Sequence, residues 1–224
     1  MTADMAWAVA PRLPAALAGF AAADGCDVFA LALDAEPTTH AWAILSDDEQ
    51  QRAQRFRSAG DRWTFVHTRC ALRQLLGQRL GVASEDVRFD VVGRGKPVLA
   101  QRWASTGLRF SVAHTAGLAV IALSNGEVGV DIERVAPESW DRDMAALVLS
   151  PAELEWVDAQ ADIHTAFFTC WTRKEAWVKM GDLGIDDGLA VITLTPTPAA
   201  AIAAEIHSGS PWPDIIVACA TGCS

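Results

Sequence analysis

The sequence predicts an α+β protein made of two similar halves, and three observations lead to that prediction. The expected elements run strand, helices, strands, and then strand, helices, strands again along the 224 residues. An Asn125-Gly126 pair, of the kind favoured in tight hairpin turns, falls between the two runs. Hydrophobic residues make up 51% of the chain, which is enough for a sizeable core. We therefore expect an N-terminal half over residues 1–125 and a C-terminal half over residues 126–224.

Local signals predict the elements of each half. A continuous apolar run predicts a buried strand over residues 28–33, and Ser46 with Glu49 at capping-box spacing predicts the start of a helix. Ser150, Pro151 and Glu153 give the second half an equally clear helix start. The other expected elements are a helix over residues 61–80 that ends at Gly81, a long helix over 165–180, a turn over 93–97, and strands over 87–92, 108–113, 118–123, 128–132, 190–194 and 215–220.

Composition and charge narrow the classes of protein. The formal net charge of −10 argues against a nucleic-acid binder, which would more often be basic. The five cysteines are scattered and include no C-x-x-C pair. Neither a zinc site nor a disulfide framework is therefore expected, and we interpret the cysteines as reduced thiols of an intracellular protein.

The N-terminal residues do not resemble a signal peptide. Asp4 stands where such a peptide carries positive charge, and Pro11, Arg12 and Pro14 interrupt the apolar run. No stretch approaches the roughly 20 apolar residues that a membrane span requires. We expect a soluble, cytoplasmic protein with no nucleic-acid or membrane partner.

Two acids share one face of the strand expected near residues 128–132. In Gly129-Val130-Asp131-Ile132-Glu133, alternate side chains point the same way, so Asp131 and Glu133 lie together. Neighbouring carboxylates repel each other, and a divalent cation removes that conflict. Mg²⁺ is often held by one or two carboxylates together with substrate phosphates. The alternative is an ordinary solvent-exposed strand face.

A third acid stands on the long helix expected over residues 165–180. Trp171, Glu175 and Lys179 are spaced four residues apart and therefore line one side of that helix. Glu175 could add a third carboxylate to a metal site while Lys179 reaches a phosphate. The alternative is an ordinary i,i+4 ion pair, which contributes roughly 0.2–0.5 kcal/mol.

Two shorter features could contact an anionic ligand. In Gly95-Lys96-Pro97 the glycine allows close approach of the backbone, the lysine offers a point charge and the proline fixes a turn. His114 ends an expected strand just before a glycine-containing turn. A plainer interpretation stays open for each feature: an ordinary surface turn at residues 95–97, and a structural role for His114.

Positive charge is concentrated in one tract. Residues 52–80 contain seven arginines and one acid, Asp61, so this tract carries +6 and the rest of the chain −16. Such an asymmetry makes one region attractive to a polyanion while the remainder repels it. A solvated helix face is the alternative.

The order of these features is more specific than any one of them. A Gly-Lys-Pro turn, Phe-Ser-Val-Ala-His at 110–114, Gly-Val-Asp-Ile-Glu at 129–133 and Trp-x-x-Lys-Glu-Ala-x-x-Lys at 171–179 together resemble the 4′-phosphopantetheinyl transferase superfamily. Within it the chain is similar to the longer, monomeric Sfp-type enzymes that activate non-ribosomal peptide and polyketide synthases. The resemblance runs from about residue 46 to residue 184, with a looser match over 215–220.

The resemblance implies two similar α/β halves related by pseudo-two-fold symmetry, with the active site in the cleft between them. It implies a monomeric 4′-phosphopantetheinyl transferase of the holo-[acyl-carrier-protein] synthase type, which moves the 4′-phosphopantetheine group of coenzyme A to a serine of an apo acyl or peptidyl carrier protein and releases 3′,5′-ADP. Mg²⁺ is the implied cofactor. The implied metal ligands are Asp131, Glu133 and Glu175, the catalytic residues are Glu175 and Lys179, and the coenzyme A contacts are Arg57, Lys96, Pro97, Ala113, His114 and Lys179.

Some of these assignments depend on details of the match. Arg57 is chosen for the 3′-phosphate because it lies just before the Asp61 segment, as in related chains. Ala113 stands where many relatives have serine, so one hydroxyl contact to phosphate is absent. After Lys179, Gly184 fits the usual spacing of the superfamily, whereas Gly181 is displaced by one residue.

Two other functions stay open at this point. One is a different Mg²⁺-dependent enzyme acting on a nucleotide, although the sequence contains no G-x-x-x-x-G-K-[ST] loop. The other is a non-catalytic module that binds coenzyme A or a carrier domain. Ala113 favours such a module, whereas the presence of all three acids and Lys179 argues against it.

Overall fold

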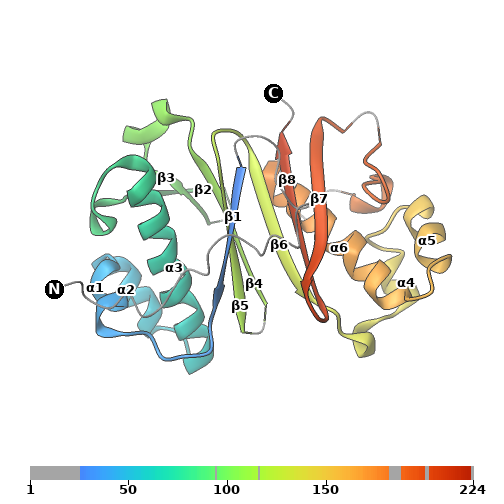
Figure 1. Cartoon of the computed structure of the whole chain (residues 1–224), viewed down its shortest axis with the longest axis horizontal. Helices are drawn as coiled ribbons and strands as arrows, with labels where there is room; N and C mark the ends of the chain where they lie inside the picture. Colours follow the sequence, from blue (N-terminus) through green and yellow to red (C-terminus); the bar gives the residue numbers. More distant parts are fainter. Residues whose placement is uncertain (1–25, 94, 116, 182–187, 200–201, 223–224) are drawn as a thin grey trace.

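Two antiparallel sheets form the centre of the molecule in the computed structural model, which describes residues 26–93, 95–115, 117–181, 188–199 and 202–222 (Figure 1). Each sheet has three strands, and a separate two-stranded ribbon lies beside the first sheet. The first sheet has the order β1 (Cys26–Ala32), β5 (Leu118–Ser124), β4 (Arg109–Thr115); the second has the order β6 (Val128–Arg134), β8 (Ile215–Gly222), β7 (Ala204–Trp212); the ribbon pairs β2 (Phe89–Val92) with β3 (Lys96–Leu99).

Helices cover the outer face of each sheet, so the layers run helix, sheet, sheet, helix (Figure 1). The predicted α+β fold with two halves is thereby confirmed. Within the described ranges, no helix combines the length and the apolar character needed to cross a lipid bilayer. The first half has α1 (Thr39–Ile44), α2 (Asp47–Gln54) and α3 (Ala59–Leu80), and the second has α4 (Arg142–Ala145), α5 (Pro151–Asp158) and α6 (Ile163–Gly181); short 3-10 turns occupy Ser84–Asp86, Gln101–Thr106 (η3), Pro137–Ser139 and Leu189–Val191.

The predicted helix boundaries follow from caps that the structure contains. At α2, the amide of Ser46 donates to Glu49 Oε2 at 2.9 Å, and the Ser46 hydroxyl accepts from the amide of Glu49 at 3.4 Å. The same reciprocal pair forms at α5 between Ser150 and Glu153. Helix α3 ends at Gly81, whose φ of 67° is a left-handed conformation that glycine adopts without strain.

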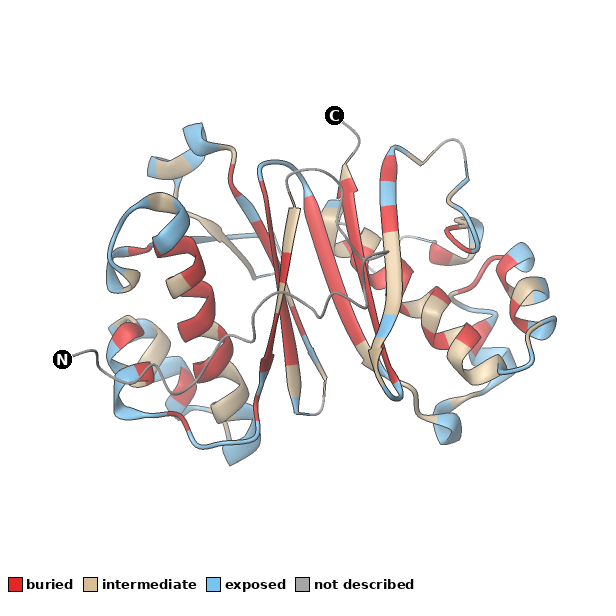
Figure 2. Cartoon of the chain, in the orientation of Figure 1, coloured by how far each residue is buried: buried red, intermediate tan, exposed pale blue. Residues whose placement is uncertain are grey.

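The main core lies between the two sheets, whose inner faces are buried (Figure 2). Two thiols meet there: Cys26 Sγ of the first sheet lies 3.8 Å from Cys219 Sγ of the second. Cys26, Cys70, Cys170 and Cys219 are all free thiols, and Cys223 lies outside the described residues. The sheets present mostly small and β-branched side chains to each other, namely Val28, Ala30, Ala113, Val120 and Ala122 from the first and Val128, Val130, Ile132, Ile215, Val217 and Cys219 from the second.

Three sequence predictions of local structure need correction. The strand expected over residues 190–194 is wrong: the chain forms a 3-10 turn at Leu189–Val191 and then an irregular segment. Strand β7 was not predicted, because its polar sequence with Gly209 and Pro211 hides the alternation typical of a strand. Lys96 and Pro97 belong to β3 rather than to the turn, and proline is tolerated because, among the described strands, β3 pairs with β2 alone.

Buried cations of α6 explain the irregular segment after residue 188. Lys174 Nζ donates to the carbonyl oxygens of Leu189 and Ile192 at 2.6 and 2.5 Å. Arg173 binds the carbonyl of Leu194 in the same way, at 2.7 Å. These carbonyls therefore find their partners on a helix, so the segment needs no neighbouring strand.

Lys174 also forms a fully buried ion pair with Glu153 of α5. Their side chains are 0% exposed, and Nζ lies 2.8 Å from Oε2. Burial lowers the pKa of Lys174, whereas the hydrogen bond and the charge of Glu153 oppose that shift. Glu153 accepts a further bond from the amide of Leu194 at 2.8 Å, so one carboxylate joins α5, α6 and the irregular segment.

We predict that Lys174→Met destabilises the fold by about 3 kcal/mol, because it leaves the Glu153 carboxylate buried without its cation. The measurement is the urea midpoint of unfolding. The double variant Glu153→Gln/Lys174→Met removes both charges and should recover part of the loss. A single variant as stable as the wild type would show that the pair has no such role.

Candidate active site

Strand β6 presents its two acids to helix α6. Val130 and Ile132 point into the core between the sheets, so Asp131 and Glu133 point the other way. Asp131 is only 4% exposed, and Glu133 is half-buried. The two acids are therefore not an exposed strand face, which was the plainer interpretation of their spacing.

A close backbone contact sets the separation between β6 and α6. A Cβ atom at Gly129 would lie 1.9 Å from the carbonyl oxygen of Ala176 and 2.5 Å from the amide nitrogen of Met180. Both distances are far below van der Waals contact, and both partners are backbone atoms that cannot rotate away. Only glycine lets this strand approach the helix so closely.

Asp131 and Lys179 meet across this contact. Lys179 Nζ lies 2.6 Å from Asp131 Oδ1, with 32% of the lysine side chain exposed. Burial raises the pKa of Asp131, and the charge of Lys179 acts in the opposite direction. Asp131 Oδ2 is buried and has no hydrogen-bond partner among the described residues.

The other two acids surround this pair. The indole N–H of Trp171 donates to Glu133 Oε1 at 3.1 Å. Burial, and after it the charge of Asp131, raises the pKa of both Glu133 and Glu175. Glu175 and Lys179 are thus not an isolated surface ion pair, because both also interact with the acid on β6.

The three acids suit a hard divalent cation, because carboxylate oxygens are the ligands that such ions prefer. Besides burial, the charge of Asp131 raises the pKa of Glu133 and of Glu175, and a divalent ion would relieve that repulsion. Asp131 Oδ2, which has no hydrogen-bond partner among the described residues, could be a ligand of such an ion. In the part of the chain that the structure describes, no group of three or more His, Cys, Asp or Glu side chains is arranged closely enough to hold a metal. The Mg²⁺ site therefore stays a prediction.

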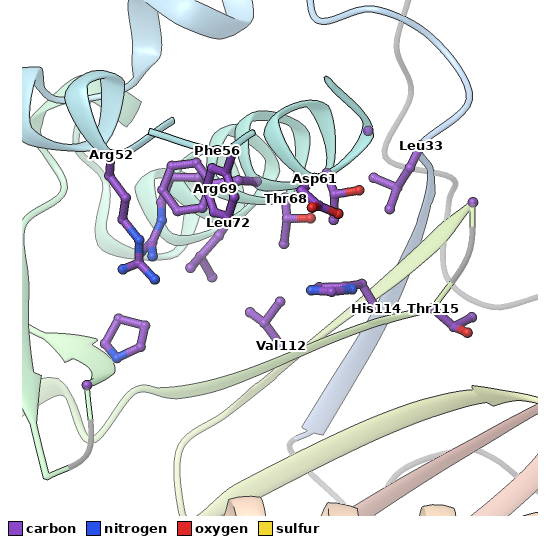
Figure 3. A pocket seen from close by; sticks show the side chains of 16 residues that line it. Leu33, Arg52, Phe56, Asp61, Thr68, Arg69, Leu72, Val112, His114 and Thr115 are labelled. Atoms are coloured by element: carbon purple, nitrogen blue, oxygen red, sulfur yellow. The ribbon is translucent and has the colours of Figure 1, made fainter. Parts of the chain in front are cut away.

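A cavity of about 850 Å³ lies in the first half, between α3 and strands β3 and β4 (Figure 3). Arg52 of α2 and Arg69 of α3 line it, and His114 of β4 lies farther along the wall. His114 also interacts electrostatically with Asp131, which connects the cavity to the acids. The arginine-rich tract thus contributes cations to a hollow large enough for a nucleotide.

The remaining predicted contact residues are placed as follows. Pro97 lines the cavity, whereas Ala113 packs in the core between the sheets. Lys96 Nζ donates to the carbonyl oxygen of Lys179 at 2.7 Å, so the ribbon of the first half touches the end of α6. Arg57 is exposed between α2 and α3 and is not among the residues that line the cavity.

Comparison with known proteins identifies the family. Residues 127–217 match the family model of the 4′-phosphopantetheinyl transferase superfamily, and residues 34–126 match that of the N-terminal part of 4′-phosphopantetheinyl transferase. The chain is 38% identical over 166 residues to the 4′-phosphopantetheinyl transferase HetI of Nostoc sp., an alignment that covers 70% of this chain and 68% of HetI. The chain belongs to the 4′-phosphopantetheinyl transferase superfamily.

Other members of the superfamily give similar matches. A putative 4′-phosphopantetheinyl transferase of Synechocystis sp. is 33% identical, over 66% of this chain and 61% of its own length. The 4′-phosphopantetheinyl transferase psf-1 of Bacillus pumilus is 29% identical, in an alignment that covers 67% of this chain and 63% of psf-1. The family and the enzyme class predicted from the motif order are thereby confirmed.

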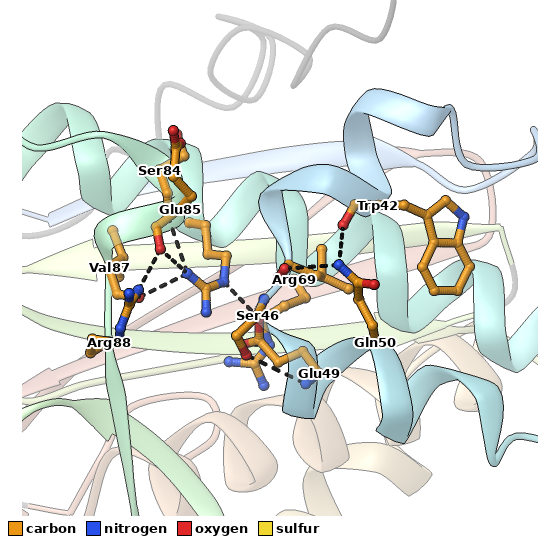
Figure 4. Close-up of polar contacts among 11 residues, drawn as sticks. Trp42, Ser46, Glu49, Gln50, Arg69, Ser84, Glu85, Val87 and Arg88 are labelled. Atoms are coloured by element: carbon orange, nitrogen blue, oxygen red, sulfur yellow. Dashed lines mark hydrogen bonds and ion pairs between the residues drawn. The ribbon is translucent and has the colours of Figure 1, made fainter.

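Not all the arginines of this phosphopantetheinyl transferase are free for a ligand. Arg73 is 1% exposed, and its Nε donates at 2.7 Å to Oε2 of Glu49, which Figure 4 labels beside Ser46. Its Nη1 donates to the carbonyl oxygen of Val87 at 2.8 Å. The capping-box acid of α2 therefore has a second role, because it also holds the cation that ties α3 to the segment before β2.

Sequence reasoning assigned no role to three residues that shape this transferase's candidate site. Trp171 fixes Glu133, and Gly129 sets the strand–helix distance. Ser111 Oγ accepts from the amide of Val130 at 3.0 Å and so joins β4 to β6. The glycine at the start of the Asp-Ile-Glu motif was a usable signal, since glycine inside a strand often marks close backbone approach.

We predict that Gly129→Ala lowers stability by about 1–3 kcal/mol and also lowers transferase activity, because the methyl group forces β6 and α6 apart. Gly126→Ala is the matched control, since a Cβ there meets nothing within 4 Å. Urea unfolding and initial rates check both variants. If the two substitutions had equal effects, the contact at Gly129 would not set the site geometry.

Proposed function

We propose that the chain transfers the 4′-phosphopantetheine group of coenzyme A to a serine of an apo acyl or peptidyl carrier protein and releases 3′,5′-ADP. The observation that carries this proposal is the contact of Asp131 with Lys179, at 2.6 Å, between two further acids and a cavity lined by arginines. Attack on a diphosphate needs positive charge and a bound cation at one place. The cavity suits the nucleotide end of coenzyme A.

We assign the metal to the three acids. Asp131, Glu133 and Glu175 would hold Mg²⁺, and Asp131 Oδ2 supports this assignment as a buried oxygen with no hydrogen-bond partner among the described residues. The chemistry that the ion supplies when bound is neutralisation of the charge on the diphosphate as 3′,5′-ADP leaves.

The chain's own residues would orient the donor and activate the acceptor. Lys179 would bind a phosphate oxygen and add positive charge on the same side. Glu175 is our candidate base, either directly or through a water molecule. It would accept the hydroxyl proton of the carrier serine as the serine oxygen bonds to the β-phosphorus and the bond to the 3′,5′-ADP oxygen breaks.

The donor's nucleotide would occupy the cavity of 850 Å³. Lys96, Pro97, Ala113 and His114 would contact it, Ala113 through its backbone because its side chain is in the core. An arginine would bind the 3′-phosphate. Arg57 is the choice from the sequence, and Arg52, which lines the cavity, is a second candidate.

Further properties belong to the same proposal. We propose a monomeric, cytoplasmic enzyme whose halves divide at residues 1–125 and 126–224, within the connection between β5 and β6. The carrier would dock through a local apolar or basic patch, because the net charge of −10 gives no broad attraction to an acidic domain.

Substitution of the acids tests the mechanism. Asp131→Ala and Glu175→Gln should each reduce transfer by about 100-fold or more, as expected when a metal ligand or a general base is removed. Mass spectrometry of an apo carrier protein incubated with coenzyme A and Mg²⁺ measures the added arm. Glu155→Gln, an exposed acid on α5, is the matched control. Near-normal turnover in both site variants would rule out this mechanism.

The arginine that binds the 3′-phosphate can be found by comparing two donors. We expect Arg52→Ala to raise the KM for coenzyme A about tenfold, because a charge-assisted hydrogen bond is lost, and to leave the KM for 3′-dephospho-coenzyme A unchanged. Arg57→Ala is measured in parallel. An effect confined to Arg57→Ala would establish the sequence-based choice and exclude Arg52.

A further inference from the structure

Two thiols face each other across the core between the sheets. Cys26 is the first residue of β1 in the first sheet, and Cys219 lies in β8 of the second sheet (Figure 1). Their Sγ atoms are 3.8 Å apart, although the two residues are 193 positions apart in the sequence. The contact therefore joins the two halves of the molecule through sulfur.

The two sulfurs differ in their access to solvent. Cys26 is half-buried, whereas Cys219 is 1% exposed. Cys26 also lies at the end of an edge strand, because the order of the described strands in its sheet is β1, β5, β4. A reagent in solution therefore reaches Cys26 and not Cys219.

The contact also makes Cys26 the better nucleophile of the pair. The hydrogen bond between the sulfurs lowers the pKa of Cys26 and opposes the effect of burial there. The same hydrogen bond, together with burial, raises the pKa of Cys219. Burial raises the pKa of the other two described thiols, Cys70 and Cys170, to about 12. Because the thiolate is the reactive form of cysteine, reactivity is concentrated at Cys26.

We propose that Cys26 is a modification site for low-molecular-weight disulfides such as oxidised glutathione, and that Cys219 converts the modified form into a disulfide between the halves. The Cys26 thiolate attacks one sulfur of the small disulfide, forms a mixed disulfide and releases one thiolate. Cys219 then loses its proton and attacks the Cys26 sulfur, which releases the second thiolate. The two thiol protons end on the two released thiolates, so the small disulfide gains the two electrons that the protein loses.

The structure allows this bond on the core side of the sheets. The sulfurs must approach from 3.8 Å to about 2.0 Å. Cys26 can make the movement, because it ends an edge strand and pairs across its sheet with Ser124 alone. Cys219 pairs with Val130, whose neighbour Asp131 points to the other face of β6. The bond therefore ties the halves together without involving the acids of the candidate site.

Peptide mapping of the full chain tests the proposal. The chain is incubated with oxidised glutathione, the remaining thiols are alkylated, and the peptides are identified by mass spectrometry without reduction. We expect a peptide linked through Cys26 and Cys219 in the wild type. Cys219→Ala should instead retain glutathione on Cys26, and Cys26→Ala should carry no modification at Cys219. Cys170→Ala, which removes another buried thiol, is the matched control and should form the same link as the wild type.

Thermal unfolding measures the effect of the bond on the folded chain. A link that closes so long a loop restricts the unfolded state, so the oxidised wild type should have a Tm about 5 °C or more above that of the reduced chain. A reductant should abolish the difference, and Cys26→Ala should show none. The proposal would be overturned by the absence of a link, by a link to Cys223 or to a second chain, or by a Tm that does not rise when the link forms.

Discussion

The approach of β6 to α6 at Gly129 is the constraint on which the candidate site depends. The strand bears Asp131 and Glu133, and the helix bears Glu175 and Lys179, so neither element alone can assemble the charges. A Cβ atom at this glycine would lie 1.9 Å from a carbonyl oxygen of the helix. The absence of one side chain thus brings together three acids and a lysine, at the cost of mutual repulsion that Lys179 and a cation can relieve.

The basic side chains divide into two groups with different roles. Arg73, Arg173 and Lys174 are buried and bind backbone carbonyls, among them those of Val87, Leu194 and Leu189, which lie outside the sheets. Arg52 and Arg69 line a cavity instead, and Arg69 also pairs with Glu49, with Nε 3.4 Å from Oε1. A count of charges along the sequence cannot separate these groups, because burial and not charge decides which cation is left for a ligand.

Much of the fold followed from the sequence because its signals are local. The capping boxes at Ser46 and Ser150 and the left-handed Gly81 act within a few residues, and the structure contains all three. The strand expected over 190–194 failed because its carbonyls bind Lys174 and Arg173, residues distant in sequence. The same distinction applies to the candidate site. Helical spacing placed Glu175 and Lys179 on one face, but no local signal showed that Trp171 binds Glu133, a residue distant in sequence.

Among the strands that the structure describes, β2 and β3 pair with no other strand, and yet β3 lines two cavities. Pro97 lines the cavity of about 850 Å³, and its neighbours Lys96 and Val98 line a smaller one of about 360 Å³. The register of β3 against β2 is therefore sensitive to the length of the turn that connects them. Inserting one residue just before Lys96 would shift the register of β3 by one residue. The side chains that now point to one face of the strand would then point to the other. The inserted residue would then stand where Lys96 now reaches the end of α6. Surface turns usually accommodate insertions without consequence, but here one extra residue would change the lining of both cavities.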